Sequence, residues 1–391
     1  MPANTGFHAG WGPVLLPVSR APAHPCIPGR RSAVNSTSAT TPRPRRRTAA
    51  AVLLAGSLGL SACGGAEDTS AATAQEDGHG ALDVNLSWIK NAEFAGEYFA
   101  DSQGYYAEAG FDSVNLISGG PSGASTESMV LAGSALVGTS SPLGVAPPIA
   151  EDDAPLKIIG TTYQKNPFTI ISLGDDPVET PQDLVGKTIG VQSGVNETLF
   201  DALLEVNGID PGEVEKAPVQ YDPQPLLSGE VDGFFGYSTN EAITLELAGE
   251  DVVNLSFADH GLPFVAESFV TTQDAIDNDR EALKSFLEAS IRGWQDAVAD
   301  PGESARLAVE EYGADLGLDL EKETRQAEIQ NEELVVSEDT EANGLFTISD
   351  ELVAQNIEVL GVAGYPGLTA EDVFDLSLLD EVYEENPELR E

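Results

Sequence analysis

The sequence predicts an α/β protein with two lobes, each built around a parallel β-sheet. Strand patterns alternate with helix patterns through residues 82–247, and short turns join them, which is typical of βαβ units. About 310 residues follow position 80, which is enough for two lobes of ordinary domain size. After residues 269–272 the pattern is helical to the end of the chain.

The first lobe is predicted to begin with a strand in which apolar and polar residues alternate. Glycine-rich turns separate the elements that follow it. In order, the elements are a strand at 82–88, a helix across 96–100 that ends near Gly104, a strand at 113–117, a turn at 118–123, a helix at 126–132 and a strand at 135–138.

The second lobe is predicted to repeat this order after the chain crosses at Asn166-Pro167. Thr180 is suited to cap a helix that has Pro181 at its first position. The elements are a crossing strand at 168–173, a strand at 187–191, a turn at 192–196 into a helix at 197–206, a strand at 229–236 and a helix at 240–247.

Beyond residue 272, apolar residues recur at spacings of three and four, which indicates one buried face of a helix. This face consists of Leu283, Phe286, Leu287, Ile291, Trp294 and Val298. We therefore interpret Trp294 as a core residue rather than a ligand contact.

The residues before the folded part have the pattern of a secretory signal peptide. A basic cluster at 43–47 precedes an apolar run at 49–60 that is too short to span a bilayer. The sequence Leu60-Ser61-Ala62-Cys63 resembles a bacterial lipobox, in which Cys63 is lipidated and becomes the mature N-terminus. We expect an extracytoplasmic protein anchored to the cell membrane through Cys63. The alternative is a plain cleavage site without a lipid.

Two further segments are left out of the predicted fold. Residues 1–40 have no periodic apolar pattern, and our hypothesis is a misassigned start codon, with the true start nearer Val34. Residues 64–80 are small, polar and unpatterned, which is typical of a flexible tether.

The chain is strongly acidic. It has 19 Lys and Arg against 65 Asp and Glu. Seven of the 19 basic residues and none of the acidic ones precede Cys63, so the mature chain holds 12 basic against 65 acidic residues, a net charge of −53. Such a surface repels phosphate backbones and anionic lipid headgroups, which argues against nucleic acid as a partner.

The folded part is expected to contain no cysteine, because Cys26 falls in the leader and Cys63 carries the lipid. Disulfides, zinc–cysteine sites and cysteine nucleophiles are thereby excluded. His260 is the one histidine left for the folded body, which also excludes a His-based metal cluster or a Ser-His-Asp triad within one chain. We expect neither a cofactor nor a metal.

Ligand contacts are expected beyond the carboxyl ends of the strands, where loops and helix N-termini converge. This rule nominates the segments 88–93, 118–125, 139–142, 192–196 and 236–241. Backbone N–H groups at the glycine turns could bind an anionic or carbonyl group, unless these turns are only tight turns. Four aromatic residues could stack on a flat heterocycle or else belong to the core: Trp88, Tyr98, Tyr163 and Tyr237.

Several segments together resemble one family, although each is weak alone. They are residues 88–98, 104–111, 163–167, 180–191 and the Gly-x-Val-Asp pattern in 226–233. These segments are similar to the thiamine-precursor (hydroxymethylpyrimidine) and alkanesulfonate-type substrate-binding proteins of ABC importers. The resemblance spans roughly residues 82–301. It implies a type II periplasmic-binding fold, in which two doubly wound lobes enclose a ligand cleft and hinge strands cross twice.

With that fold, the chain divides into five parts. Residues 1–62 are leader and signal peptide, 63–80 are the lipidated cysteine and tether, 81–170 are lobe I, 171–270 are lobe II, and 271–391 are a helical return to lobe I. The resemblance implies a small-molecule ligand and a membrane permease as partners, and we expect a monomer.

Within the family, residues 237–241 resemble the pyrimidine-recognising branch, in which a glutamate accepts hydrogen bonds from an exocyclic amine and a ring nitrogen. Glu241 is the residue in that position, and its alternative role is to stabilise the start of its own helix. Riboflavin-like and sulfonate or taurine-type ligands remain alternatives. None of the five Arg in the mature chain lies in the nominated segments, which disfavours a sulfonate.

No enzymatic activity is expected. The family includes fungal synthases of the thiamine pyrimidine that use a histidine and a cysteine-rich motif, but Phe94 stands at the histidine position and the folded part has no cysteine. A carboxylate-based hydrolase is a distant alternative. The expected ligand-binding residues are Trp88, Asn91, Tyr98, Ser140, Tyr163, Asn166, Gly194, Tyr237, Asn240 and Glu241.

Overall fold

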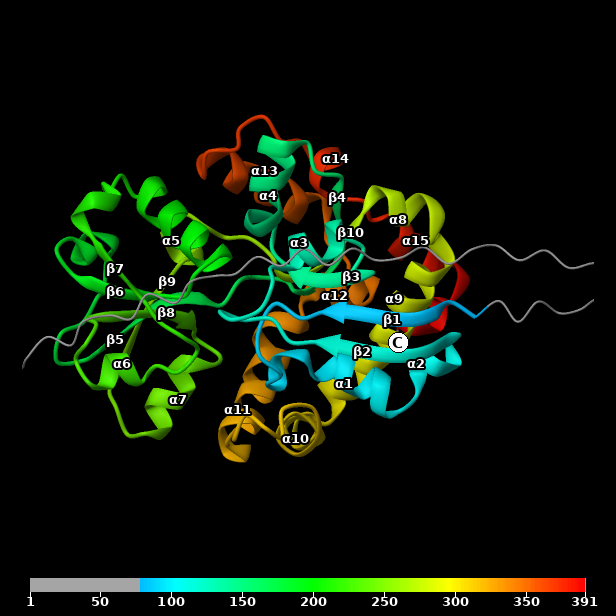
Figure 1. Ribbon diagram of the computed structural model, residues 1–391, viewed down its shortest axis with the longest axis horizontal. Helices are drawn as coiled ribbons and strands as arrows, with labels where there is room; N and C mark the ends of the chain where they lie inside the picture. The colour runs from blue at the N-terminus through cyan, green and yellow to red at the C-terminus, as the bar shows by residue number, and fades with distance from the viewer. Residues whose placement is uncertain (1–77, 391) are drawn as a thin grey trace, which may run out of the picture. The chain divides into compact units, whose positions relative to one another are not determined.

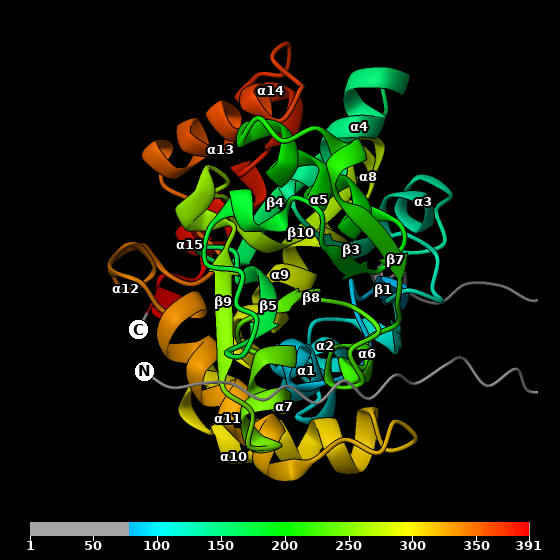
Figure 2. The same cartoon turned by 90° about the vertical axis from the view of Figure 1, so that its left-hand side faces the viewer.

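The computed structural model of the chain describes residues 78–390. The predicted leader, the predicted lipidation site Cys63 and nearly all of the predicted tether lie outside the described residues. Residues 78–390 form two lobes, each around a five-stranded sheet, and the C-terminal helices pack around the first sheet (Figure 1, Figure 2). No helix in this range combines the length and the apolar character needed to cross a membrane.

Lobe I contains a sheet in the order β2-β1-β3-β10-β4. Strands β1, β2 and β3 are parallel, whereas β10 runs antiparallel to both of its neighbours. The strands are β1 (Gly80–Asn85), β2 (Phe111–Ile117), β3 (Val137–Ser140), β4 (Leu156–Tyr163) and β10 (Ala266–Thr272).

Lobe II repeats this arrangement in the order β7-β6-β8-β5-β9. Here β6, β7 and β8 are parallel, and β5 runs antiparallel to β8 and β9. The strands are β5 (Phe168–Leu173), β6 (Thr188–Val191), β7 (Glu215–Pro218), β8 (Gly233–Tyr237) and β9 (Val252–Ser256).

Helices connect the strands and form the C-terminal third of the chain. A 3₁₀ turn, η1 (Ala92–Phe94), leads into the first of them. The α-helices are α1 (Ala95–Ser102), α2 (Tyr105–Glu108), α3 (Thr126–Leu131), α4 (Pro142–Asp152), α5 (Val195–Val206), α6 (Gln224–Leu227), α7 (Glu241–Leu247), α8 (Gln273–Asn278), α9 (Arg280–Ala299), α10 (Pro301–Arg306), α11 (Leu320–Gln330), α12 (Glu338–Asn343), α13 (Asp350–Val362), α14 (Ala370–Val373) and α15 (Ser377–Glu385).

The one reversed strand in each sheet is the strand that arrives from the other lobe. The chain crosses to lobe II at residues 164–167, just before β5, and returns at residues 257–265, just before β10. The other strands of each sheet point their carboxyl ends at the cleft, so a strand that begins at the cleft must run the opposite way. Phe168 pairs with Tyr237 and Ser268 with Ser140, which puts the starts of β5 and β10 beside the ends of β8 and β3.

The predicted two-lobed α/β fold is confirmed, including the crossing strand at 168–173. The sheet pairing puts β10 in lobe I, whereas the sequence division extended lobe II to residue 270. Strand β1 ends at Asn85 rather than at residue 88, so Trp88 lies in the following loop. Helix α4 was missed because Pro147 and Pro148 lie inside it, a position that normally argues against a helix.

The predicted apolar face of α9 is confirmed. Leu283, Phe286, Leu287, Ile291 and Trp294 are buried, and Val298 packs at the edge of the same core. Helix α9 lies close against α1, and two glycines allow this approach. A Cβ at Gly96 would collide with the Trp294 ring, and a Cβ at Gly293 would collide with the carbonyl oxygen of Gly96.

We predict that Gly293→Ala destabilises lobe I by about 2 kcal/mol or more, because the added methyl group must push α9 away from α1. Denaturant unfolding followed by circular dichroism measures the change. Gly361→Ala is the matched control, since the nearest atom to its Cβ is 3.9 Å away in an α-helix. Equal stabilities for the two variants would contradict the close-packing argument.

We also predict that the protein loses stability as the pH rises from 5 to 8, partly through Glu97. This side chain is 1% exposed, and its Oε1 accepts a hydrogen bond from Trp294 Nε1 at 3.2 Å. Burial raises its pKa to about 7, so the folded state holds the proton more tightly than the unfolded chain. The stabilisation that comes from this tighter proton binding is therefore complete below the pKa of the unfolded chain. It is lost as the pH rises through about 7, which lowers the free energy of unfolding by about 3 kcal/mol.

Glu97→Gln should remove this part of the pH dependence, so that the variant gains stability relative to the wild type at pH 8 but not at pH 5. Unfolding free energies at the two pH values test it, with the exposed Glu358→Gln as control. Parallel pH profiles for Glu97→Gln and the wild type would refute the assignment.

Candidate ligand-binding site

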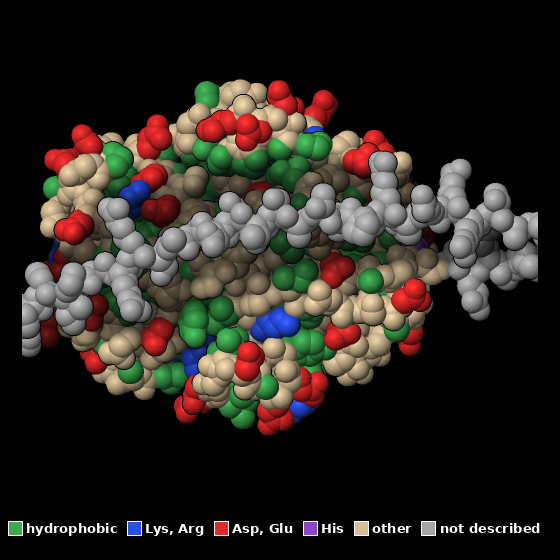
Figure 3. Space-filling model, viewed as in Figure 1, with side chains coloured by type: hydrophobic (Ala, Val, Ile, Leu, Met, Phe, Trp, Pro, Cys, Tyr) green, Lys and Arg blue, Asp and Glu red, His purple; other side chains and the backbone are tan. Residues whose placement is uncertain are grey.

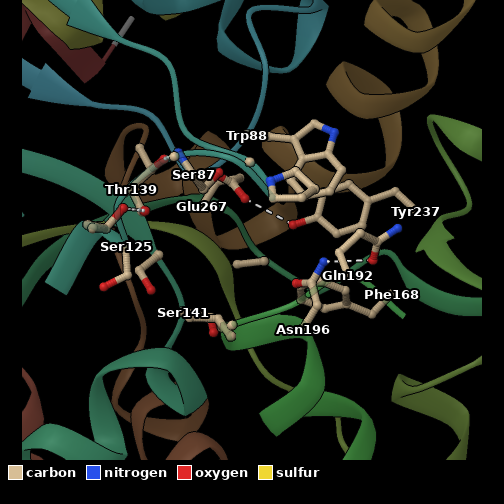
Figure 4. A pocket seen from close by; sticks show the side chains of 18 of the residues that line it. Ser87, Trp88, Ser125, Thr139, Ser141, Phe168, Gln192, Asn196, Tyr237 and Glu267 are labelled. Atoms are coloured by element: carbon tan, nitrogen blue, oxygen red, sulfur yellow. Dashed lines mark hydrogen bonds between the residues drawn. The ribbon is translucent and has the colours of Figure 1, made fainter. Parts of the chain in front are cut away.

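A cleft lies between the two lobes, and all five nominated segments contribute to its lining. Its empty volume is about 960 Å³, the part open to solvent included. Loops after β1 and β3 line it from lobe I, and loops after β6 and β8 line it from lobe II. Figure 4 shows side chains from both lobes pointing into this space. The carboxyl-end rule therefore located the cleft correctly.

Six of the ten predicted ligand residues line the cleft. They are Trp88, Ser140, Gly194, Tyr237, Asn240 and Glu241. Gly194 has a positive φ of 95° at the start of α5, a conformation that favours glycine. Their contact with a ligand stays a prediction.

The other four predicted residues do not line the cleft, and each has a structural role instead. Tyr98 stacks on Tyr312 in the interior of lobe I, with ring centroids 4.4 Å apart. The hydroxyl of Tyr163 donates to Gln330 Oε1 at 2.9 Å. Asn91 caps the 3₁₀ turn η1, with its Oδ1 accepting from the backbone N–H of Glu93.

Asn166, the fourth of these residues, holds the two crossings together. Its Nδ2 donates to the carbonyl oxygens of Leu262 at 2.7 Å and Phe264 at 3.3 Å, both in the return crossing. Its Oδ1 accepts from the backbone N–H of Phe168. Asn166 therefore positions the hinge and does not reach the cleft.

Sequence reasoning missed two cleft residues because they begin the reversed strands. Phe168 starts β5 and Glu267 is the second residue of β10, so both lie at the cleft although they are at the amino ends of their own strands. A signal for Glu267 was present, since a lone glutamate in the otherwise uncharged strand Ala266–Thr272 is buried at a cost unless it has partners.

Glu267 connects the two lobes. Its Oε2 accepts a hydrogen bond from Ser87 Oγ of lobe I at 2.7 Å, and its Oε1 accepts from the Tyr237 hydroxyl of lobe II at 2.9 Å (Figure 4). Its backbone has a φ of 49°, which is strained for a residue with a side chain. Burial raises the pKa of its carboxyl group, and the hydrogen bonds from Ser87 and Tyr237 oppose that shift.

Glu93 faces Glu267 from the turn before α1. It is 2% exposed, and its Oε2 has no hydrogen-bond donor among the described residues. Burial raises the pKa of Glu93 well above its usual value, and the neighbouring Glu267 carboxylate raises it further. The negative charge of each carboxyl group therefore opposes the ionisation of the other.

Glu241 is largely engaged within its own turn. Its Oε2 accepts from the backbone N–H of Tyr237 at 2.8 Å, and its Oε1 accepts from Asn240 Nδ2 at 3.1 Å. Burial raises its pKa to about 6. These contacts fit the alternative role from the sequence, in which Glu241 stabilises the start of α7. Its contact with the ligand stays a prediction.

The lining is acidic and aromatic. Glu127 is a further buried carboxylate, and its Oε1 accepts from Ser140 Oγ at 2.6 Å. No Lys or Arg lines the described cleft. Acidic side chains are also scattered over both lobes on the face that Figure 3 shows. The rings of Trp88 and Tyr237 enter from opposite lobes, and Phe168 packs edge-on against Tyr237 with ring centroids 4.7 Å apart.

Curated relatives include two binding proteins. The riboflavin-binding protein RibY of Chloroflexus aurantiacus is 28% identical over 232 residues, 58% of this chain and 64% of that protein. The formylaminopyrimidine-binding protein of Halalkalibacterium halodurans is 25% identical over 233 residues, 58% of this chain and 69% of that protein. The match thus spans less than two thirds of the riboflavin-binding relative.

An enzyme is also among the relatives. The 4-amino-5-hydroxymethyl-2-methylpyrimidine phosphate synthase of Legionella pneumophila is 27% identical over 158 residues, 39% of this chain and 50% of that protein. The matching region covers only part of each chain, so the activity of this relative does not transfer directly.

Solved structures share the fold at low identity. The alkanesulfonate-binding protein SsuA of Xanthomonas axonopodis pv. citri has a TM-score of 0.56 at 14% identity, covering 75% of this chain and 98% of that chain. A Candida albicans protein described as having the generic periplasmic binding protein fold has a TM-score of 0.53 at 14% identity, covering 78% and 95%. The profile of the family described as NMT1/THI5 like matches residues 91–304, more than half of the sequence. The chain therefore belongs to the NMT1/THI5-like family and has the periplasmic-binding-protein fold.

Proposed function

We propose that this protein is the extracytoplasmic solute-binding component of an ABC importer and that it captures a small planar nitrogen heterocycle, such as a pyrimidine precursor of thiamine. The observation that carries the proposal is the lining of the cleft, in which aromatic rings from both lobes lie beside buried carboxyl groups. An aromatic face and an acidic hydrogen-bonding edge are what a flat, amine-bearing ring requires.

Binding by both lobes supports a closing mechanism. Trp88 belongs to lobe I and Tyr237 to lobe II, so a ring held by both favours the conformation in which the lobes are together. The two crossings at 164–167 and 257–265 are the segments about which the lobes would move. In this proposal the permease binds the closed conformation and receives the ligand from it.

Riboflavin-like flavins are the second candidate. A flavin is a larger flat heterocycle that could stack on the same aromatic rings of the cleft. The relative RibY, named as a riboflavin-binding protein, gives this candidate its support. A sulfonate is disfavoured, because the described lining offers four carboxylates and no cationic side chain to an anion.

Binding without catalysis is part of the proposal. Phe94 is buried, and it occupies the position of the histidine that the sequence resemblance assigns to the synthases. His260 does not line the cleft, and its Nδ1 is 2.8 Å from the carbonyl oxygen of Ser256. The described residues of the cleft thus include no histidine or cysteine for nucleophilic or general-base chemistry.

We predict that Trp88→Ala raises the dissociation constant for the heterocyclic ligand about tenfold or more, because the substitution removes one of the aromatic faces on which the ring stacks. Mass spectrometry of ligand that co-purifies with residues 78–391 would identify the ligand, and calorimetry would then compare the variants. Trp88→Phe keeps an aromatic face and should retain most of the affinity.

The control is Tyr221→Ala, which removes an exposed aromatic ring outside the cleft. If Trp88→Ala binds as tightly as Tyr221→Ala does, the stacking role of Trp88 is wrong. If no pyrimidine or flavin binds the wild type, the proposed ligand class is wrong.

The lipid anchor leads to a separate prediction about localisation. In cells that make the full chain, Cys63→Ala should release the protein from the membrane fraction, because Cys63 carries the lipid in this proposal. Cys26→Ala is the matched control and should leave membrane retention unchanged. Retention of Cys63→Ala in salt-washed membranes would count against the anchor.

A further inference from the structure

Helix α11 buries a polar side, whereas the buried face of α9 is largely apolar. Long polar side chains recur on this side of α11 at helical spacing, and all of them are buried: Lys322, Glu323, Gln326 and Gln330. Burying such groups is costly unless they find hydrogen-bonding partners. The partners that they find therefore indicate what α11 is built to contact.

In lobe I, α11 holds the turn η1 by its backbone. Glu323 Oε2 accepts a hydrogen bond from the N–H of Ala92 at 2.8 Å, and Gln330 Nε2 donates to the carbonyl oxygen of the same residue at 2.8 Å. Ala92 is the first residue of η1 and directly precedes Glu93, which lines the cleft. Helix α11 thus fixes a turn that carries a cleft residue of lobe I.

In lobe II, α11 holds the start of α7 through Lys322. The ammonium group of Lys322 donates to Asn240 Oδ1, and Asn240 Nδ2 donates to Glu241 Oε1 at 3.1 Å. An ammonium group can only donate and a carboxylate can only accept, so one orientation of the Asn240 amide satisfies both neighbours. Asn240 and Glu241 line the cleft and Lys322 does not. Lys322 therefore orients cleft side chains from outside the cleft.

The two contacts are continuous, because Lys322 Nζ also donates to Glu323 Oε1 at 3.0 Å. A chain of hydrogen bonds thereby runs from Ala92 of lobe I through Glu323 and Lys322 to Asn240 of lobe II. Lys322 is 7% exposed and Glu323 is fully buried. An apolar pair in place of a buried ion pair is often as stable, so the pair is better explained by the one arrangement that it selects than by added stability.

The same junction leaves two buried polar atoms without partners among the described residues. They are Thr239 Oγ1, next to Asn240, and Gln326 Nε2 of α11. A permanent interface rarely keeps unpaired polar atoms, whereas an interface that separates returns them to water. These atoms fit a contact that forms on closing of the lobes and breaks on opening.

We propose that Lys322 is a positioning residue for ligand capture. It touches no ligand, but it ties the Asn240 turn of lobe II to the Ala92 turn of lobe I in the closed protein and is released when the lobes separate. The inference rests on the proposed function, since it concerns the closure that retains the bound heterocycle. Its consequence is that Lys322 slows release of the ligand and has little effect on the initial encounter.

The experiment measures both rate constants by stopped-flow fluorescence on the full chain. The probes are 4-amino-5-hydroxymethyl-2-methylpyrimidine and riboflavin, and Trp88 in the cleft contributes the protein signal. Lys322→Met keeps the length of the side chain and removes its charge and donors. We expect this variant to release the probe about tenfold faster and to change its association rate constant less than about twofold.

Lys284→Met is the matched control. Lys284 is 8% exposed, and its Nζ lies 2.7 Å from Glu385 Oε1, so this substitution also removes a buried lysine with an ion pair. Its acidic partners lie on α9 and α15, outside lobe II and outside the cleft. Both rate constants should therefore equal those of the wild type.

Hydrogen exchange in the ligand-free protein gives a second measurement. Lys322→Met should exchange faster than Lys284→Met at both 92–94 and 241–247, and saturating probe should remove the difference. If Lys322→Met fails to fold, the double variant Lys322→Met/Glu323→Gln carries the test, because it leaves no unpaired charge and keeps an acceptor for the N–H of Ala92.

Unchanged release in Lys322→Met, or equally fast release in Lys284→Met, would overturn the inference and leave heterocycle binding intact. If the wild type binds neither probe, the proposed function is wrong instead. The exchange comparison still decides on the contact in that case, and equal exchange in the two variants would overturn it.

Discussion

The hydrogen bonds of Glu267 join the parts of the molecule on which its function depends. One carboxyl group accepts from Ser87 of lobe I and from Tyr237 of lobe II, and it lies on the strand that follows the second crossing. Because Glu267 and Ser87 both belong to lobe I, opening of the lobes would lengthen or break the bond to Tyr237. Glu267 also lines the cleft, so the bond between the lobes lies within the candidate ligand site.

A second contact between the lobes lies outside the cleft. Helix α11 comes from the C-terminal region, yet it lies against α7 of lobe II in both views (Figure 1, Figure 2). Arg325 of α11 pairs with Glu246 of α7 at 2.6 Å, and Lys322 contacts Asn240 at the start of α7. Asn240 also donates to Glu241, so this contact reaches the cleft through two adjacent residues. The α7–α11 contact and the Glu267 bonds therefore hold the lobes together from two sides.

The sequence predicted the strand–helix order and the five cleft segments, because both follow from local periodicity and from the direction of parallel strands. It could not predict that Phe168 and Glu267 lie in the cleft, since this depends on which strands run backwards. Tyr98 and Tyr163 were predicted to line the cleft but do not, for a related reason. An aromatic residue in a favourable segment has the same sequence pattern whether it faces the cleft or the core, and both are fully buried in lobe I.

The fold determines where the ligand binds far more than it determines which kind of ligand binds. An alkanesulfonate-binding protein shares this fold at 14% identity, and a fold of this kind serves many ligands. The side chains that line the cleft therefore determine which ligand binds. Four of them here are glutamates, and the described lining contains no Lys or Arg. Desolvating that much negative charge is tolerable only if protons, a ligand or a nearby cation neutralise it, and the buried Lys322 of α11 acts against the raised pKa values of Glu93 and Glu241. Burial raises the pKa values of Glu93, Glu127 and Glu241, so these side chains hold their protons more tightly in the cleft than in water.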